Sequence, residues 1–103
     1  MKNSTFKDFV LDQMSGLGNL DCRAMFGGFG LYSGEIFFGI LFKDRLYFKT
    51  DPVTRREYTR QGMEPFRPNR PQTLPKYYEV QAEVVENATQ LGEWARKAIA
   101  CAK

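Results

Sequence analysis

The stretch RAMFGGFGLYSGEIFFGI, residues 23–40, decides the fold, because its closely spaced glycines can be read in two ways. A dinucleotide-binding loop needs its glycines between a strand and a helix that opens directly on them. Here a strand follows instead, since SG at 33–34 is a two-residue hairpin signal and EIFFGILF at 35–42 is the most strand-like segment of the chain. We therefore predict that these glycines allow a bulge or a tight bend in a sheet and bind no phosphate.

Short turns extend this region into an antiparallel sheet. Residues 43–44 (KD) separate it from RLYFK at 45–49, and strands joined by so few residues must be antiparallel. The expected elements, in chain order, are a helix at 4–14, strands at 21–26, 29–32, 35–42 and 45–49, a helix at 51–62, a strand at 76–80, a helical turn at 82–88 and a helix at 91–102. This order, α-β-β-β-β-α-β-α, predicts an α+β two-layer sandwich with an antiparallel sheet of about five strands and helices packed on one face. The whole chain, residues 1–103, is expected to form a single domain.

Alternation along the strands assigns side chains to the two faces of this sheet. One set is expected to form the core under the helices: Ile36, Phe38, Ile40 and Phe42, with Leu46 and Phe48 sharing one face of the next strand. Phe37, Leu41 and Tyr47 then fall on the other face, which a two-layer domain leaves open. Exposed apolar patches of this kind mark interaction surfaces. We therefore expect Phe37, Leu41 and Tyr47 to form a protein interface, with a homodimer as one form of it.

The residue types present restrict the chemistry that the chain can perform. It contains no histidine, so Ser-His and Cys-His nucleophile pairs are impossible and the commonest metal ligand is missing. The two cysteines, Cys22 and Cys101, lack the spacing of a zinc or redox motif and are expected to be free thiols. No carboxylate pair has a spacing that singles it out for acid–base catalysis. We therefore expect a protein that is not an enzyme and that binds no metal or cofactor.

The distribution of apolar residues indicates where the protein works. No apolar run approaches the ~20 residues that a membrane-spanning helix needs. Asp8 and Asp12 interrupt the first apolar stretch, which is therefore unlike a signal peptide. These features predict a cytoplasmic location and no contact with a membrane.

A basic segment offers an alternative function. The net charge is only +3, but positive residues concentrate in one part of the chain, and they are Arg55, Arg56, Arg60, Arg67 and Arg70. The first three lie on the outer face of the expected helix at 51–62, and the last two lie in a proline-rich segment expected to be an extended loop at 64–75. Such a set can track a phosphate backbone, so a nucleic-acid-associated regulator is the second hypothesis.

Two further alternatives stay open at this stage. The segment PFRPNRP (65–71) contains two overlapping P-x-x-P units, which can dock as a polyproline II helix or simply stiffen a loop. A pocket beside Arg23 and the glycine bend would make the chain a small-ligand binder or an enzyme of unknown chemistry.

Several segments together resemble one known family. The element R-x-MFGG-x-G-L-Y is similar to the N-terminal domain of the TfoX/Sxy competence regulators, and the resemblance runs from the first helix to Ala102. The matching motif residues are Arg23, Met25, Phe26, Gly27, Gly28, Gly30, Leu31 and Tyr32. Further matches follow in the expected order at LYFKTD (46–51), PF (65–66), YYEV (77–80) and WARKAI (94–99).

The resemblance implies both a fold and a role. It implies an antiparallel α+β sandwich similar to secretion-chaperone-like folds, and a bacterial regulatory or binding module in which the motif residues are structural. Regulators of this family act in transcription with the cAMP receptor protein at competence promoters, which makes that protein an expected partner. These regulators carry a second, C-terminal domain, so we expect this chain to be a stand-alone, single-domain member. The family supplies no catalytic residues to transfer.

Overall fold

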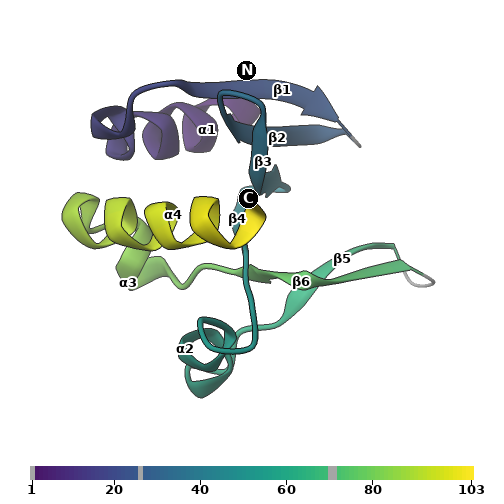
Figure 1. Cartoon of the computed structure of the whole chain (residues 1–103). Helices are drawn as coiled ribbons and strands as arrows, with labels where there is room; N and C mark the ends of the chain where they lie inside the picture. Colours follow the sequence, from purple (N-terminus) through teal and green to yellow (C-terminus); the bar gives the residue numbers. More distant parts are fainter. Residues whose placement is uncertain (1, 26, 70–71) are drawn as a thin grey trace.

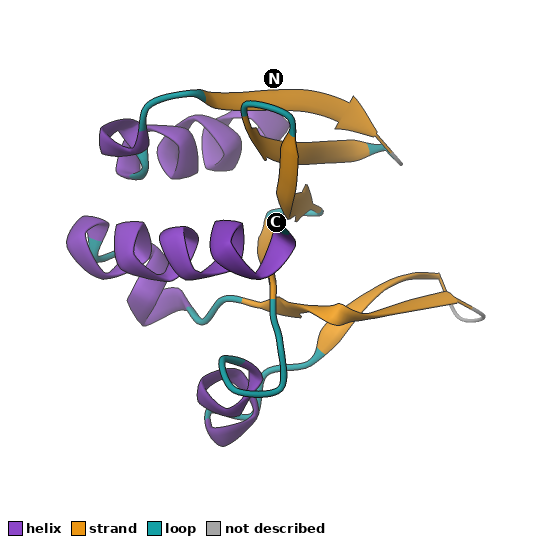
Figure 2. Ribbon diagram, in the orientation of Figure 1, coloured by secondary structure: helices purple, strands orange, loops and turns teal. Residues whose placement is uncertain are grey.

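The computed structural model describes residues 2–25, 27–69 and 72–103, and within them it contains two layers. One layer is a six-stranded antiparallel sheet, and the other consists of helices that lie on one face of it (Figures 1 and 2). The elements are α1 (Lys2–Gln13), the 3-10 helix η1 (Ser15–Leu17), β1 (Leu20–Met25), β2 (Gly28–Ser33), β3 (Ile36–Phe42), β4 (Arg45–Lys49), α2 (Arg55–Arg60), β5 (Pro65–Asn69), β6 (Gln72–Glu79), α3 (Ala82–Val85) and α4 (Ala88–Ala102). The α+β two-layer prediction is confirmed.

The strand order is β1-β2-β3-β4-β6-β5, and every neighbouring pair is antiparallel. The prediction of about five strands was one short. The proline-rich segment, predicted as a loop, forms β5 and the first part of β6. An outer strand tolerates proline because one side of it needs no N–H donor. Pro75 is tolerated in β6 because only residues 77–79 of that strand pair with β4.

A β-bulge changes which residues of β3 face the helices. Leu31 pairs with Gly39 but Tyr32 pairs with Phe37, so Phe38 is an extra residue opposite β2. The alternation of side chains is therefore interrupted at this point. Beyond the bulge, Leu41 lies under the helices, whereas Ile40 and Phe42 lie in an apolar cluster on the other face.

This register corrects three of the predicted positions. Leu41 is only 3% exposed and belongs to the main core, so its assignment to an open interface was wrong. Ile40 and Phe42 were predicted under the helices and lie on the opposite face. Phe38 is in the main core, as predicted.

The main core lies between the sheet and the helices. Leu91, Ala95 and Ala98 form the buried stripe of α4, which crosses the sheet in Figure 1. The two alanines are small, so they let the helix backbone approach the strands closely. The side chain of Asn87 starts this helix by accepting a hydrogen bond from the backbone N–H of Gln90 at 3.0 Å.

The connection from β4 to α2 has a cap of its own. Asp51 Oδ1 accepts hydrogen bonds from the N–H groups of Val53 (2.9 Å) and Thr54 (2.8 Å). Thr54 Oγ1 accepts a reciprocal bond from the N–H of Asp51 at 3.0 Å. Asp51 is a typical N-cap residue followed in the sequence by Pro52, and these bonds confirm that it caps the turn that leads into α2.

The glycine bend has a steric explanation. A Cβ atom at Gly28 would collide with the carbonyl oxygen of Leu41, so β2 and β3 approach too closely there for any side chain. Gly27 has a φ of +80°, a conformation that side chains disfavour. Phe26, between these glycines and β1, lies outside the described residues. The glycines thus fit the predicted bend, with a strand on either side of it.

Candidate protein interface

The face of the sheet opposite the helices carries a row of stacked side chains. The Arg23 guanidinium lies 4.2 Å from the centre of the Tyr32 ring. The Tyr32 and Phe37 rings have centroids 5.2 Å apart, and Phe37 and Tyr77 follow at 5.4 Å. Lys49 Nζ ends the row, 5.8 Å from the Tyr77 ring centre. We call these five residues the aromatic strip.

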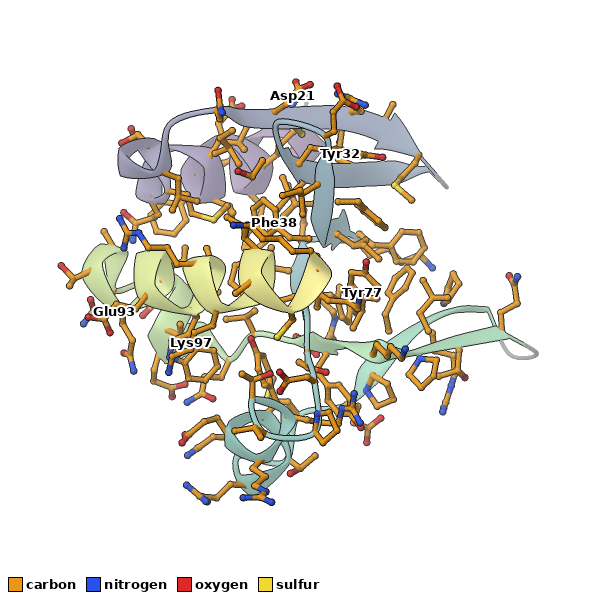
Figure 3. The ribbon with its side chains drawn as sticks, viewed as in Figure 1. Asp21, Tyr32, Phe38, Tyr77, Glu93 and Lys97 are labelled. Carbon is orange, nitrogen blue, oxygen red and sulfur yellow. The ribbon has the colours of Figure 1, made fainter. Side chains whose placement is uncertain are left out.

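The strip joins residues that are far apart in the sequence. Its members come from β1, β2, β3, β6 and β4, and the pairs Tyr32–Phe37 and Tyr77–Lys49 are direct cross-strand partners. Figure 3 shows Tyr32 and Tyr77 on the side of the strands opposite Glu93 and Lys97 of α4. The Tyr32, Phe37, Tyr77 and Lys49 side chains are partly exposed. A continuous surface therefore crosses most of the sheet.

Gly30 forms the floor of the strip. A Cβ atom there would lie 3.1 Å from the rings of both Tyr32 and Phe37 and would also meet Met25 Sδ. The missing side chain therefore leaves room for these three residues to pack together. Four residues of the motif singled out in the sequence, Arg23, Met25, Gly30 and Tyr32, meet at this place.

A second apolar cluster lies on the same face, beside the strip. Phe66 of β5 is fully buried and packs against Tyr47 (ring centroids 4.8 Å apart) and Phe42 (5.3 Å). Ile40, 1% exposed, is the third buried member of this cluster, after Phe66 and Tyr47. The β5–β6 hairpin therefore covers part of the face that was predicted to be open.

The predicted interface residues are consequently separated. Phe37 lies in the aromatic strip, Tyr47 is 8% exposed beneath Phe66, and Leu41 is in the main core. Tyr77 and Phe66 were not predicted as part of this surface, whereas alternation along β4 already places Lys49 on the same face as Tyr47. Alternation could have indicated Tyr77, because its neighbour Tyr78 packs against the main core and adjacent strand residues face opposite sides.

Comparison with known families agrees with this geometry. A family model described as the TfoX N-terminal domain matches residues 12–102. The chain belongs to the TfoX N-terminal domain family. The match spans both the glycine motif and the strands that supply the aromatic strip of this TfoX N-terminal domain. No curated protein matches the chain.

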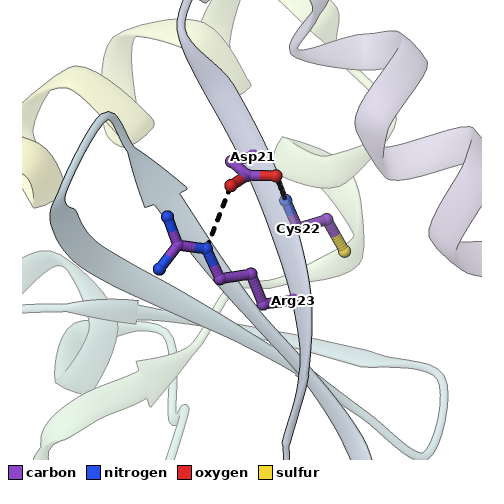
Figure 4. Close-up of polar contacts among 3 residues, drawn as sticks. All are labelled: Asp21, Cys22 and Arg23. Atoms are coloured by element: carbon purple, nitrogen blue, oxygen red, sulfur yellow. Dashed lines mark hydrogen bonds and ion pairs between the residues drawn. The ribbon is translucent and has the colours of Figure 1, made fainter.

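The charges at the β1 end of the strip neutralise each other (Figure 4). Arg23 Nε donates to Asp21 Oδ2 at 3.0 Å, and the N–H of Cys22 donates to Asp21 Oδ1 at 2.9 Å. The bond from Arg23, followed by that from Cys22, lowers the pKa of the Asp21 carboxyl below its usual value. Asp21 therefore remains a carboxylate at neutral pH.

The same face also carries an ion pair and a partly buried tyrosine hydroxyl. Arg45 Nη1 donates to both carboxylate oxygens of Glu79, each at 3.0 Å. Burial raises the pKa of the Tyr77 hydroxyl to about 12, with a smaller contribution from Tyr32. The Tyr77 hydroxyl is therefore neutral at physiological pH and can donate a hydrogen bond.

The described residues of the basic segment lie on two different elements of the TfoX N-terminal domain. Arg55, Arg56 and Arg60 belong to α2, whereas Arg67 belongs to β5 and Arg70 lies outside the described residues. Arg55 Nε donates to Thr50 Oγ1 at 3.0 Å. Arg60 lies 3.5 Å from Glu57, and Arg67 donates to Thr73 at 3.1 Å. Three of these side chains thus already make polar contacts within the domain.

Two shallow hollows lie on either side of Phe6 and the turn at Asp44. One, of about 240 Å³, is lined by Gly27, Gly28 and Lys7 among others. The other, of about 270 Å³, is lined mainly by apolar side chains, including Phe9. Arg23 lines neither of them. Both volumes fall below the roughly 300–1,000 Å³ of small-molecule pockets.

The described residues hold neither a cluster of metal ligands nor a membrane-spanning helix. They contain no group of three or more potential metal-ligating side chains. None of their helices is long and apolar enough to cross a bilayer.

Proposed function

We propose that this TfoX N-terminal domain is a non-enzymatic, cytoplasmic protein-interaction module of a regulatory system, and that it binds its partner through the aromatic strip. The observation that supports this proposal is the row of partly exposed rings from Tyr32 to Tyr77 on the helix-free face. Tyrosine and phenylalanine rings contribute large contact areas at low entropic cost, and they are enriched in protein interfaces.

The arrangement of the rings favours a protein over single-stranded nucleic acid. Bases stack on open ring faces, but here Arg23 and Phe37 approach the Tyr32 ring from the two neighbouring strands. Arg23 is also paired with Asp21 and Arg45 with Glu79, so a carboxylate already balances the charge of each cation and weakens its attraction for a phosphate. The row of three rings offers a partly exposed apolar surface with a tyrosine at each end, which suits a mixed apolar and polar protein surface.

The cAMP receptor protein, the partner that the family resemblance implies, is the first probe. We would titrate the labelled domain with purified cAMP receptor protein and follow fluorescence anisotropy. Tyr32→Ala and Arg23→Ala are expected to weaken binding by about tenfold or more, because truncated interface anchors have effects of that size. Arg56→Ala, which changes an exposed residue of α2, is the matched control and should bind like the wild type.

Circular dichroism of each variant verifies that the fold is retained. The proposal is contradicted if Arg56→Ala weakens binding while Tyr32→Ala and Arg23→Ala do not, because the basic helix would then be the binding surface. A parallel titration with duplex DNA, started at low salt, distinguishes the aromatic strip from the basic helix as the binding surface. Phosphate contacts of the helix would make binding decrease steeply as the salt concentration rises.

A further inference from the structure

We propose that two copies of this chain associate through β1, which pairs antiparallel with β1 of the second copy about a two-fold axis at Cys22. The two six-stranded sheets would then form one continuous sheet, with the helices of both copies on the same face. This proposal does not depend on the proposed function, because it rests on the backbone hydrogen bonds of the sheet edge, and Arg23 is the one residue of the aromatic strip that it involves.

The two edges of the sheet differ in their ability to pair. The sheet ends in β1 on one side and β5 on the other. β5 contains Pro65 and Pro68, which cannot donate a backbone hydrogen bond and therefore discourage pairing. β1 contains no proline, and no strand in the described part of the chain pairs with its outer edge. β1 is therefore the edge that can accept another strand.

The hydrogen-bond pattern shows which residues of β1 are available. Gly34 N donates to Asn19 O at 3.1 Å, next to the register in which Leu20 pairs with Ser33. Bonded and non-bonded pairs alternate in an antiparallel ladder, so Asn19 and every second residue after it bond to β2. The N–H and C=O groups of Leu20, Cys22 and Ala24 consequently point to the outer edge.

The contact at Cys22 agrees with this assignment. Its N–H is held by the Asp21 carboxylate at 2.9 Å and not by β2 (Figure 4). A side chain thus occupies the donor that a second strand would use. On pairing, the Cys22 carbonyl of the second copy would accept that N–H, and the carboxylate would be released toward a new partner.

The charges on β1 then select one register. Residues whose N–H and C=O groups point to the outer edge must pair with residues of the same kind in the second copy. Three registers near the middle of β1 satisfy this condition, and they are centred on Asp21, Cys22 and Arg23. One places Asp21 opposite its own copy, and another places Arg23 opposite its own copy, so like charges meet in both. The third, centred on Cys22, places Asp21 opposite Arg23 of the second copy at two symmetric positions. Each carboxylate then lies between two guanidiniums, one from its own strand at 3.0 Å and one from the other copy.

The other face of β1 is also compatible with pairing. Leu20 and Cys22 are half-buried and pack against the main core. In the Cys22-centred register Leu20 faces Ala24 of the second copy, so the apolar layer under the helices would continue across the axis. A one-residue slip would reverse every side chain and place the helix layers of the two copies on opposite faces.

Sedimentation equilibrium of the full chain over a range of concentrations tests the proposal. The wild type is expected to show a monomer–dimer equilibrium. Asp21→Arg and Arg23→Asp each place like charges opposite one another at two symmetric positions, and each should weaken dimerisation by about tenfold or more. Val53→Glu, a charge change at an exposed residue on the helix side of the chain, is the control and should dimerise normally.

Two rescue experiments make the test specific. An equimolar mixture of Asp21→Arg and Arg23→Asp should form heterodimers, because every opposed pair again has opposite signs. The double variant Asp21→Arg/Arg23→Asp should also recover self-association, although it lacks the native contacts of Asp21 and Arg23. A wild type that stays monomeric up to about 1 mM, or single variants that dimerise like the wild type, would overturn the proposal. So would a mixture that stays monomeric.

Discussion

The two faces of the sheet are covered in different ways. Separate helices cover one face, and their side chains bury Phe38, Leu41 and Phe48 almost completely. Among the described residues, the other face is covered by the sheet's own β5–β6 hairpin, which buries Ile40 and Tyr47 with Phe66. The aromatic strip next to this cluster remains partly exposed. The comparison indicates that the helix face provides most of the stability, and that the opposite face combines a smaller core with a partly exposed row of rings.

A single bulge separates these roles. Because Phe38 is an extra residue, Phe37 and Leu41 lie on opposite faces of the sheet, and each packs against apolar side chains there. The same strand thereby contributes to the main core and to the aromatic strip. Substitutions on the two faces should therefore differ in the size and in the kind of effect.

The largest effect is expected from Leu41→Glu. This change places a carboxylate under the helices at a site that is 3% exposed, where an unpaired charge costs several kcal/mol. Because a domain of this size has a stability of about 5–15 kcal/mol, we expect most of the fold to be lost. Far-UV circular dichroism measures the loss of secondary structure, and urea unfolding measures the loss of stability.

Val53→Glu is the control for this prediction, because Val53 is 67% exposed and should accept the charge without loss. A Leu41→Glu variant that keeps its fold and loses only self-association would restore the original assignment of Leu41 to an interface.

Phe66→Ala should have an intermediate effect. It removes the central ring of the smaller cluster and leaves a cavity beside Tyr47, so we expect the free energy of unfolding to fall by about 3–5 kcal/mol. The helix face is untouched, and the variant should remain folded in the absence of denaturant. Urea titration gives the value, and Phe66→Leu, which keeps most of the volume, should lose less than about 1.5 kcal/mol. Complete unfolding would show that the two faces do not contribute separately.

Tyr77 should make a smaller contribution that depends on pH. Burial raises the pKa of its hydroxyl in the folded state to about 12, above the value of about 10 for an unfolded chain. The unfolded state therefore ionises first, and this contribution is complete below pH 10 and lost as the pH rises from 10 to 12.

Burial also raises the pKa values of Tyr47 and Tyr58, so absorbance titration of Tyr77→Phe should show one late-ionising tyrosine fewer than the wild type. The variant should also lose less stability over this pH range. If Tyr77→Phe instead removes a tyrosine that titrates near pH 10, the strip is less buried around Tyr77 than described.

The smallest effect is expected from the ion pair at the edge of this face. The side chains of Arg45 and Glu79 are 59% and 22% exposed, and ion pairs of this kind contribute about 0.2–1 kcal/mol. A double-mutant cycle with Arg45→Gln and Glu79→Gln, measured by thermal unfolding, gives the coupling. The coupling should decrease at high salt. A coupling above about 2 kcal/mol would show that this pair holds β4 and β6 together.

The sequence was sufficient for the features that depend on local pattern. Hairpin signals gave the first four strands, the stripe of Leu91, Ala95 and Ala98 gave the last helix, and the missing helix after the glycines argued against a phosphate loop. Asp51 was also recognisable as a cap, because its hydrogen bonds reach only two and three residues along the chain. These features involve neighbours in the sequence, whose spacing can be read directly.

Only the tertiary structure decided which residues share a surface. The bulge at Phe38 depends on how β2 and β3 fit together, and it moved Leu41 from a predicted interface into the core. Phe66 comes from a proline-rich segment that forms a strand only because it pairs with β6 at the end of the sheet. Tyr32 and Tyr77 are 45 positions apart in the chain, and the strand order alone makes them parts of one strip. Long-range pairing is selected by the packing of the whole sheet, and no local pattern encodes it.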